Sequence, residues 1–228
     1  MIKKAFIYFS LFICISLCTS CFEILEEITL NKDGSGTVMV TLNMSKSKTK
    51  LASLMLLDSI NGYKIPSEDE IDESFKDILY HLEKTPGISN IKKTKDFDNY
   101  IFTISCDFKN VDNVNAIFKE LIKKQNKNNY TNFTTTNLSY NPSENVFNRH
   151  FTYDDAIKKS FNTLKNEDRK VFDNASYTCI YRFQDKVKSV SNTNAKIAPN
   201  KGAVFLKIDA LSLILGEKNV ENKIQLIN

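Results

Sequence analysis

The sequence predicts an α+β protein in which an antiparallel sheet built from hairpins carries helices packed on one face. Segments with apolar residues at alternate positions, typical of half-buried strands, come mostly in pairs joined by turn sequences. Segments with helical apolar spacing stand between these pairs rather than between single strands, which argues against a doubly wound parallel sheet. A hydrophobic content of 42%, with 16 Phe but only six Gly and four Pro, predicts an ordered core.

The first pair of strands is expected at residues 22–31 and 36–43, around the turn sequence NKDGSG. Asp33-Gly34 and Gly36 would supply the positive-φ positions that a hairpin loop needs. A phosphate loop or a calcium loop is disfavoured here, because a strand rather than a helix follows the turn. We therefore interpret this segment as a structural β-hairpin.

Two helices are expected next. Residues 45–60 have helical spacing, and their second half is apolar around much of the circumference. Burial in the core is the favoured interpretation, and contact with a partner or with lipid is the alternative. Residues 67–84 form the clearest helix, since Ser67 and Glu70 are spaced as a capping box and a Pro-Gly pair follows its end.

The rest of the chain alternates in the same way. The expected elements are a hairpin at 88–95 and 99–108, a helix at 111–125, a strand pair at 130–140 and 145–151, a helix from Tyr153 to about Lys170 capped by Thr152, and strands at 176–184, 186–191 and 203–209. ALSLIL then predicts a short helix and IQLI a last edge strand. Whether the strands form one sheet or two lobes split near 127–130 is open from the sequence.

The first twenty-one residues have the layout of an export signal. Lys3 and Lys4 form a basic start, an apolar run of fourteen residues follows, and small residues lead to Cys21. At 1.5 Å per residue this run spans roughly 21 Å, which is short of the ~30 Å hydrocarbon core of a bilayer. We therefore expect removal of residues 1–20 and export of an α+β domain over residues 21–228.

The end of this segment resembles the lipobox of bacterial lipoproteins, in which a Leu and two small residues precede a Cys. Thr19, Ser20 and Cys21 match, whereas the leucine is displaced to Leu17 and Cys18 takes its usual place. The resemblance implies lipidation of Cys21 and attachment to a membrane through acyl chains such as palmitate. Two or three chains hold firmly, because each buried methylene contributes about 0.8 kcal/mol. A soluble exported protein and an uncleaved anchor are the alternatives.

The residues after the cysteine bear on location within the bacterial cell envelope. Phe22 stands where an Asp can mark retention in the inner membrane of some bacteria, so the outer membrane is favoured over the inner membrane. Glu23, Glu26 and Glu27 follow closely. They are either a signal for export to the cell surface or the exposed face of the first strand.

Two further cysteines, Cys106 and Cys179, remain in the mature chain. Both fall on apolar faces of expected strands, which permits a disulfide in an oxidising compartment, and buried free thiols are the alternative. Loss of the signal lowers the formal net charge from +4 to +2, with both signs interspersed. We therefore expect no nucleic-acid partner.

The sequence lacks the motifs of common chemistries: a nucleophile elbow, a metal-ligand cluster, a dinucleotide fingerprint and a triphosphate loop. His81 and His150, the two histidines, have no convincing partners. We therefore expect no metal, no cofactor and no enzymatic activity, with a hidden carboxylate pair as the one enzymatic alternative.

Two functions remain. The first is a membrane-tethered, non-catalytic binding or scaffold domain with an unknown protein partner. The second is a carrier of a lipid or other apolar ligand, held in a cavity between sheet and helices that Phe and Tyr line. The hairpin-rich pattern and the NKDGSG motif are similar to those of lipid-binding bacterial envelope lipoproteins, which slightly favours the carrier. A carrier requires an apolar cavity of several hundred Å³.

Overall fold

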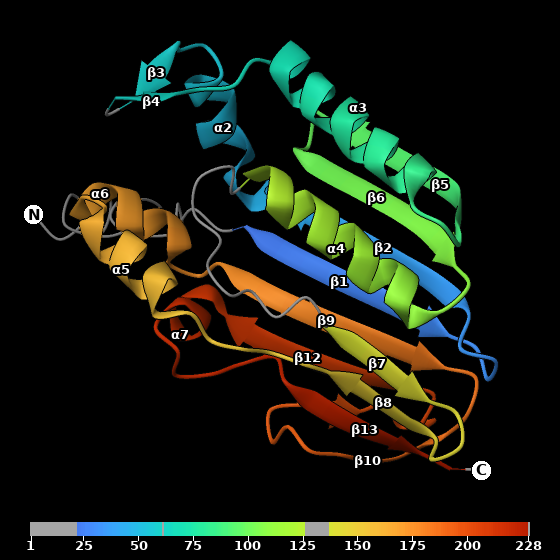
Figure 1. Cartoon of the computed structure of the whole chain (residues 1–228). Coiled ribbons are helices and arrows are strands. Elements are labelled where there is room, and N and C mark those ends of the chain that lie inside the picture. Colours follow the sequence, from blue (N-terminus) through green and yellow to red (C-terminus); the bar gives the residue numbers. More distant parts are fainter. Residues whose placement is uncertain (1–21, 61, 126–136, 228) are drawn as a thin grey trace, which may run out of the picture.

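The computed structural model describes residues 22–60, 62–125 and 137–227. The signal segment, Cys21 and the positions 127–130 lie outside the described residues. The predicted α+β class is confirmed, because the chain forms mostly antiparallel sheets with helices packed on them (Figure 1).

The main sheet has seven strands. In spatial order they are β11 (Lys196–Ile197), β12 (Ala203–Asp209), β9 (Ser176–Phe183), β1 (Glu23–Leu30), β2 (Gly36–Asn43), β6 (Ile101–Phe108) and β5 (Ile88–Asp96). All neighbours are antiparallel except β1 and β9, which are parallel. Strands from both sides of 127–130 therefore join in one sheet, with β1 at its centre.

The predicted first hairpin is confirmed, with Glu23 opposite Asn43 and Leu30 opposite Gly36. Gly34 adopts a φ of 85°, which favours glycine. Gly36 is needed for a different reason from the predicted one: a Cβ atom there would lie 2.0 Å from the carbonyl oxygen of Thr29. The turn thus uses one glycine for its conformation and one for close approach of the two strands.

A second sheet has four strands, in the order β10 (Val187–Val190), β13 (Asn222–Leu226), β8 (Val146–Arg149) and β7 (Leu138–Asn141). The prediction that the last strand lies at an edge is wrong, because β13 pairs with β10 on one side and β8 on the other. Its alternate residues are buried, as Ile224 at 0% exposure illustrates. This alternation shows that one face of β13 packs on the core.

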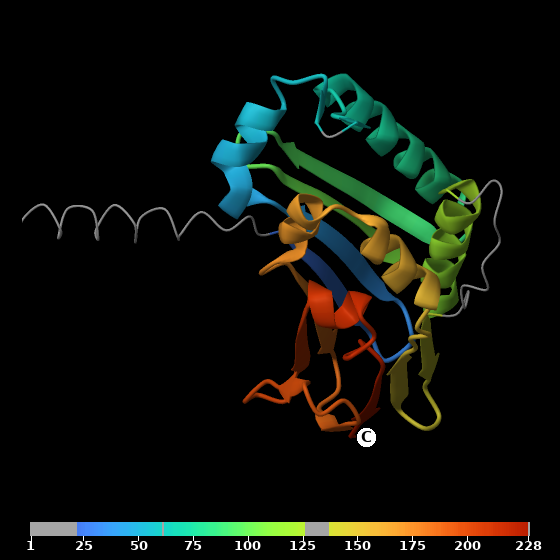
Figure 2. The same cartoon turned by 90° about the vertical axis from the view of Figure 1, so that its left-hand side faces the viewer.

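One face of the main sheet carries all the covering elements. Helices α3 (Glu68–Lys84) and α4 (Val111–Gln125) cover the β2, β6 and β5 side, and the second sheet covers the β1 and β9 side (Figures 1 and 2). The ring of Phe147 on β8 lies 5.2 Å from that of Tyr181 on β9. The predicted capping box of α3 is confirmed, since the Ser67 side chain and the Glu70 side chain each bond the other residue's backbone N–H.

Short elements gather at the end of the main sheet where β1 begins (Figure 1). They are η1 (Ser45–Ser47), α2 (Lys48–Leu54), β3 (Ser59–Ile60), β4 (Tyr63–Lys64), α5 (Asp155–Thr163), α6 (Asn166–Arg169), η2 (Lys170–Phe172) and α7 (Ala210–Ile214). The expected helix 153–170 is divided because Leu164 is extended, and Asp154 rather than Thr152 caps its first part. The expected helix 45–60 ends at Leu54.

Burial of the 45–60 segment in the core is also contradicted. Leu56 is 86% exposed and Leu57 is 48% exposed. The chain leaves the helix after Leu54 and forms the small β3–β4 hairpin, a separate two-stranded sheet whose described residues are exposed. No helix in the described part of the chain is both long and apolar enough to cross a membrane.

Candidate functional site

An apolar groove of about 490 Å³ opens at the end of the main sheet where β1 begins. Helix α2 and the β3–β4 hairpin form one wall, and the segment from the end of α5 to η2 forms the other. The lining residues are Ser47, Lys50, Leu51, Leu54, Ile60, Tyr63, Leu164, Glu167, Asp168, Val171 and Phe172. Its volume lies within the range of roughly 300–1,000 Å³ that is usual for ligand sites.

The strand pairing explains why these walls meet. Asn43, the last residue of β2, lies opposite Glu23, so the chain enters η1 and α2 beside the start of β1. Ser176, the first residue of β9, pairs with Glu23 on the other side, and η2 lies just before it. Both walls therefore extend from strands that flank β1 at the same end.

The groove lies next to the first described residue. The ring of Phe22 is 6.0 Å from that of Phe172, which lines the groove, in an edge-to-face arrangement. The Ser176 N–H donates to the carbonyl oxygen of Phe22 at 3.0 Å. Since consecutive Cα atoms are ~3.8 Å apart, the candidate lipidation residue Cys21 directly precedes this contact.

A second apolar cavity lies where the carrier hypothesis places it, between α3, α4 and the β2–β6 part of the sheet. Its lining residues are Val38, Val40, Ile78, Leu82, Ile104, Ser105, Cys106, Val114, Ile117 and Phe118. Its volume of about 200 Å³ is below the several hundred Å³ that the hypothesis requires. The larger apolar space is the groove, not the predicted cavity.

A buried charge network occupies the centre of the molecule. Glu26 on β1 is 2% exposed and accepts hydrogen bonds from Arg149 Nε at 3.2 Å and Nη2 at 3.1 Å, and from the hydroxyls of Tyr177 at 2.6 Å and Tyr181 at 2.7 Å. Burial alone would raise the pKa of Glu26, but the Arg149 charge and the two hydroxyls outweigh burial and lower it. With its acceptors all engaged, the network fastens β1 to β8 and β9.

This network corrects one expectation about the acidic residues after Cys21. Glu26 faces the core, so it is neither an exposed strand residue nor an accessible signal. Glu23 and Glu27 lie on the other face of β1, where Glu23 pairs with Lys207 and Glu27 with Arg182.

The structure does not bring Cys106 and Cys179 together. Both are buried free thiols, as in the alternative to a disulfide. They lie on β6 and β9, which are separated by β2 and β1, so three strand spacings of ~4.8 Å put them roughly 14 Å apart. A disulfide needs Cα atoms within about 7 Å. Burial raises the pKa of Cys106 to about 11 and that of Cys179 to about 12.

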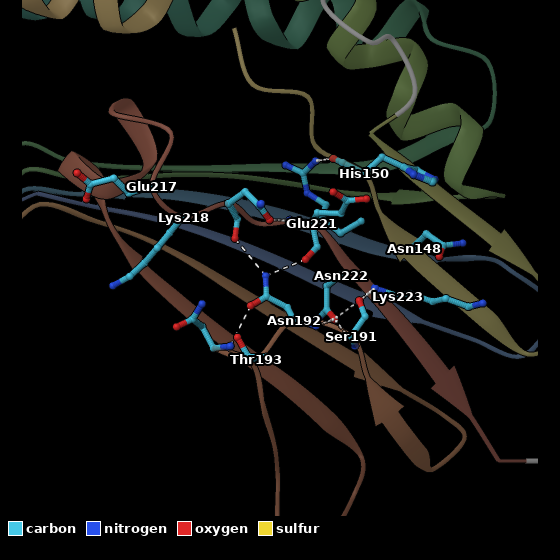
Figure 3. A pocket seen from close by; sticks show the side chains of 13 residues that line it. Asn148, His150, Ser191, Asn192, Thr193, Glu217, Lys218, Glu221, Asn222 and Lys223 are labelled. Atoms are coloured by element: carbon cyan, nitrogen blue, oxygen red, sulfur yellow. Dashed lines mark hydrogen bonds between the residues drawn. The ribbon is translucent and has the colours of Figure 1, made fainter. Parts of the chain in front are cut away.

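A polar pocket of about 380 Å³ lies between the second sheet and its loops (Figure 3). Its amides mainly hold the loops: Asn222 Oδ1 accepts from the backbone N–H of Asn192 at 3.1 Å, and Asn192 Nδ2 donates to the carbonyl oxygen of Glu221 at 2.8 Å. His150, on its border, lies 2.9 Å from Ser139 Oγ, a contact that the sequence analysis missed. No described carboxylate contacts His150, so this pair lacks the third group of a catalytic triad.

Within the described ranges, no group of three or more His, Cys, Asp and Glu side chains is arranged to hold a metal ion. His81, on α3, lies 3.9 Å from Asp77 one turn away, at 25% side-chain exposure. That contact is an ordinary pair of neighbours on a helix surface.

Comparisons with known proteins add little. No protein-family model matches the sequence, and no curated protein matches it significantly. Among solved structures, the chain is similar to the folded domain of the LppM protein of Mycobacterium tuberculosis, determined by NMR. The match has 10% sequence identity and a TM-score of 0.43, and it covers 91% of this chain and 90% of that chain. A similarity of this size transfers no function.

Proposed function

We propose that the chain is a bacterial lipoprotein, held in the cell envelope by acyl chains on Cys21, whose exported domain is a non-catalytic binding or scaffold domain. The outer membrane is the favoured location. The observation that carries the proposal is the export signal that ends in Thr19, Ser20 and Cys21.

The geometry after the signal supports this proposal. Phe22 already contacts Phe172, and β1 begins at Glu23. The folded domain thus starts one residue after the proposed anchor. Attachment at Cys21 would hold the groove-bearing end of the domain close to the lipid.

The test is intact-mass measurement and membrane fractionation of the native protein beside a Cys21→Ala variant. We expect a native chain that begins at Cys21, carries added acyl mass and sediments with membranes. The Cys21→Ala variant should lack the acyl mass and remain uncleaved or be released.

Cys14→Ala is the matched control, because it removes another cysteine of the same segment, outside the lipobox positions, and leaves the proposed lipidation site. It should behave as the native protein does. A native chain that starts near Cys21 without added mass and is soluble in both forms would refute lipidation.

A second candidate function is a carrier of a lipid or other apolar ligand, and the apolar groove favours it. Seven of the groove's lining side chains are apolar or aromatic: Leu51, Leu54, Ile60, Tyr63, Leu164, Val171 and Phe172. Burial of an acyl segment there would gain about 0.8 kcal/mol for each methylene removed from water.

Lipid extraction and mass spectrometry of the purified protein test this second function. A stoichiometric lipid should accompany the native protein and be lost from Leu54→Asp, which puts a charge on the groove wall. Ile227→Asp is the control, since Ile227 is exposed and lies outside the groove. Absence of a stoichiometric lipid from the native protein would reject the carrier function.

A further inference from the structure

Exposed apolar side chains are concentrated beside the mouth of the groove. Leu56 is 86% exposed, Leu57 48%, Ile60 39% and Tyr63 55%. These four residues fall within eight positions of the chain, on the turn after α2 and on the β3–β4 hairpin. A cluster of this kind on a soluble domain is typical of an interaction surface rather than of scattered surface residues.

The same segment is basic. From Met44 to Ile65 the chain contains four lysines and a single acid, Asp58. Lys46, Lys48 and Lys50 are exposed, and none of them forms an ion pair with a described residue, whereas Lys64 pairs with Glu70. Lys48 lies near Asp96 and donates to Asn99 Oδ1 at 3.3 Å, so its charge is partly offset. Three lysines that form no ion pair with a described residue, in the same segment as exposed leucines, favour an anionic, apolar partner over a purely apolar one.

The position of this surface is the ground for choosing among partners. Met44 follows Asn43, which lies opposite the first residue of β1. Ile60 and Tyr63 line the groove together with Phe172, which contacts Phe22. The basic, apolar surface therefore lies at the end of the domain where the chain leaves toward Cys21.

We propose that Leu56, Leu57, Ile60 and Tyr63, with Lys46, Lys48 and Lys50, form a docking face that rests on the lipid bilayer holding the Cys21 anchor. The apolar side chains enter the boundary between headgroups and acyl chains, and the lysines lie near anionic headgroups. This inference rests on the proposed lipid attachment. It adds that the domain is oriented on the membrane rather than free to rotate about its anchor.

The docking face can be tested with one inserted fluorophore, because the chain contains no Trp. The full lipidated protein, carrying Leu56→Trp, is reconstituted into vesicles of phosphatidylcholine and phosphatidylglycerol with and without brominated acyl chains. Insertion of a side chain by about 5–10 Å would bring the indole near the bromines, so its fluorescence should fall at least about twofold and its emission should shift to shorter wavelength.

Ile227→Trp is the matched control. Ile227 is 42% exposed. It follows Leu226, whose strand partner Val187 comes just after Phe183, the end of β9 that lies away from Phe22 and the docking face. Its fluorescence should be unaffected by brominated lipid. Replacing Lys46, Lys48 and Lys50 by Gln in the Leu56→Trp protein should reduce the quenching.

Sedimentation of the same vesicles separates the two proposals. Protein that fails to sediment with the vesicles would refute the lipid anchor. Protein that sediments, but whose Leu56→Trp fluorescence is no more quenched than that of Ile227→Trp, would refute docking while leaving the anchor intact. A spectral shift that depends on protein concentration and not on brominated lipid would assign the face to a second copy of the chain, which also overturns docking.

Discussion

Replacing Arg149 by Met should strongly destabilise the protein, because it leaves a buried carboxylate without its counter-charge. Glu26 would lose the hydrogen bonds from Nε at 3.2 Å and Nη2 at 3.1 Å and keep only those from two tyrosine hydroxyls. Its side chain is 2% exposed, so water cannot replace the guanidinium. Breaking a buried pair in this way costs about 3–5 kcal/mol, a large part of the ~5–15 kcal/mol that stabilises a typical domain.

Denaturant unfolding followed by far-ultraviolet circular dichroism would measure this loss. Arg182→Met is the matched control, because Arg182 also pairs with a glutamate of β1, Glu27, but is 47% exposed. An exposed pair of this kind contributes about 1 kcal/mol or less. Equal and small losses from the two variants would show that the core does not depend on the network.

The pH dependence provides an independent measurement of the same network. In the native protein the pKa of Glu26 is lowered from its ordinary value of 4.5, because the Arg149 charge and the tyrosine hydroxyls outweigh the effect of burial. A lowered pKa gives stability that is present above pH 4.5 and is lost as the pH falls below it. In Arg149→Met the effect of burial should dominate and raise the pKa of Glu26. The contribution of Glu26 would then be present at acidic pH and lost as the pH rises, so an unchanged pH profile would contradict this reasoning.

Three smaller predictions concern single positions. Gly36→Ala should lower the free energy of unfolding by about 2–3 kcal/mol, because the added Cβ would lie 2.0 Å from a backbone oxygen. Gly62→Ala is the comparison: no atom lies within 4 Å of its Cβ, so it should lose only about 1 kcal/mol, from its φ of 86°. Ser67→Ala should lower the free energy of unfolding by about 1 kcal/mol through loss of the α3 cap. Cys106 and Cys179 should resist a thiol reagent at pH 8 until the protein unfolds, because both are buried and their pKa values are raised to about 11 and about 12.

Local patterns predicted much of this fold. The β1–β2 hairpin, the capped helix α3 and the strand β9 depend on turn residues, a capping box and alternation that lie within one segment. The parallel pairing of β1 with β9 could not be predicted, because it joins residues more than 150 positions apart and no local signal specifies it. The contact between Glu26 and Arg149 depends on that pairing and spans 123 positions, so the sequence left Glu26 among the exposed candidates.

Residues 51–60, which include part of the proposed docking face, show a different limit of sequence analysis. A segment that is apolar around its circumference has the same periodicity whether it is buried or presented to lipid. Residues 51–60 were therefore expected in the core. The structure excludes burial, because the helix ends at Leu54 and Leu56 and Leu57 after it are exposed.

Buried residues are distributed unevenly at the end of the domain next to Cys21. Helices α2, α5 and α6 and the 3-10 helix η2, which form most of the groove's two walls, contain no buried residue. Such elements open at low free energy, as binding surfaces generally must. The strand that leads away from the anchor is instead the central strand β1, where Ile28 is 1% exposed and Glu26 is held by four hydrogen bonds. Attachment at Cys21 would therefore act directly on a buried central strand, beside elements that contain no buried residue.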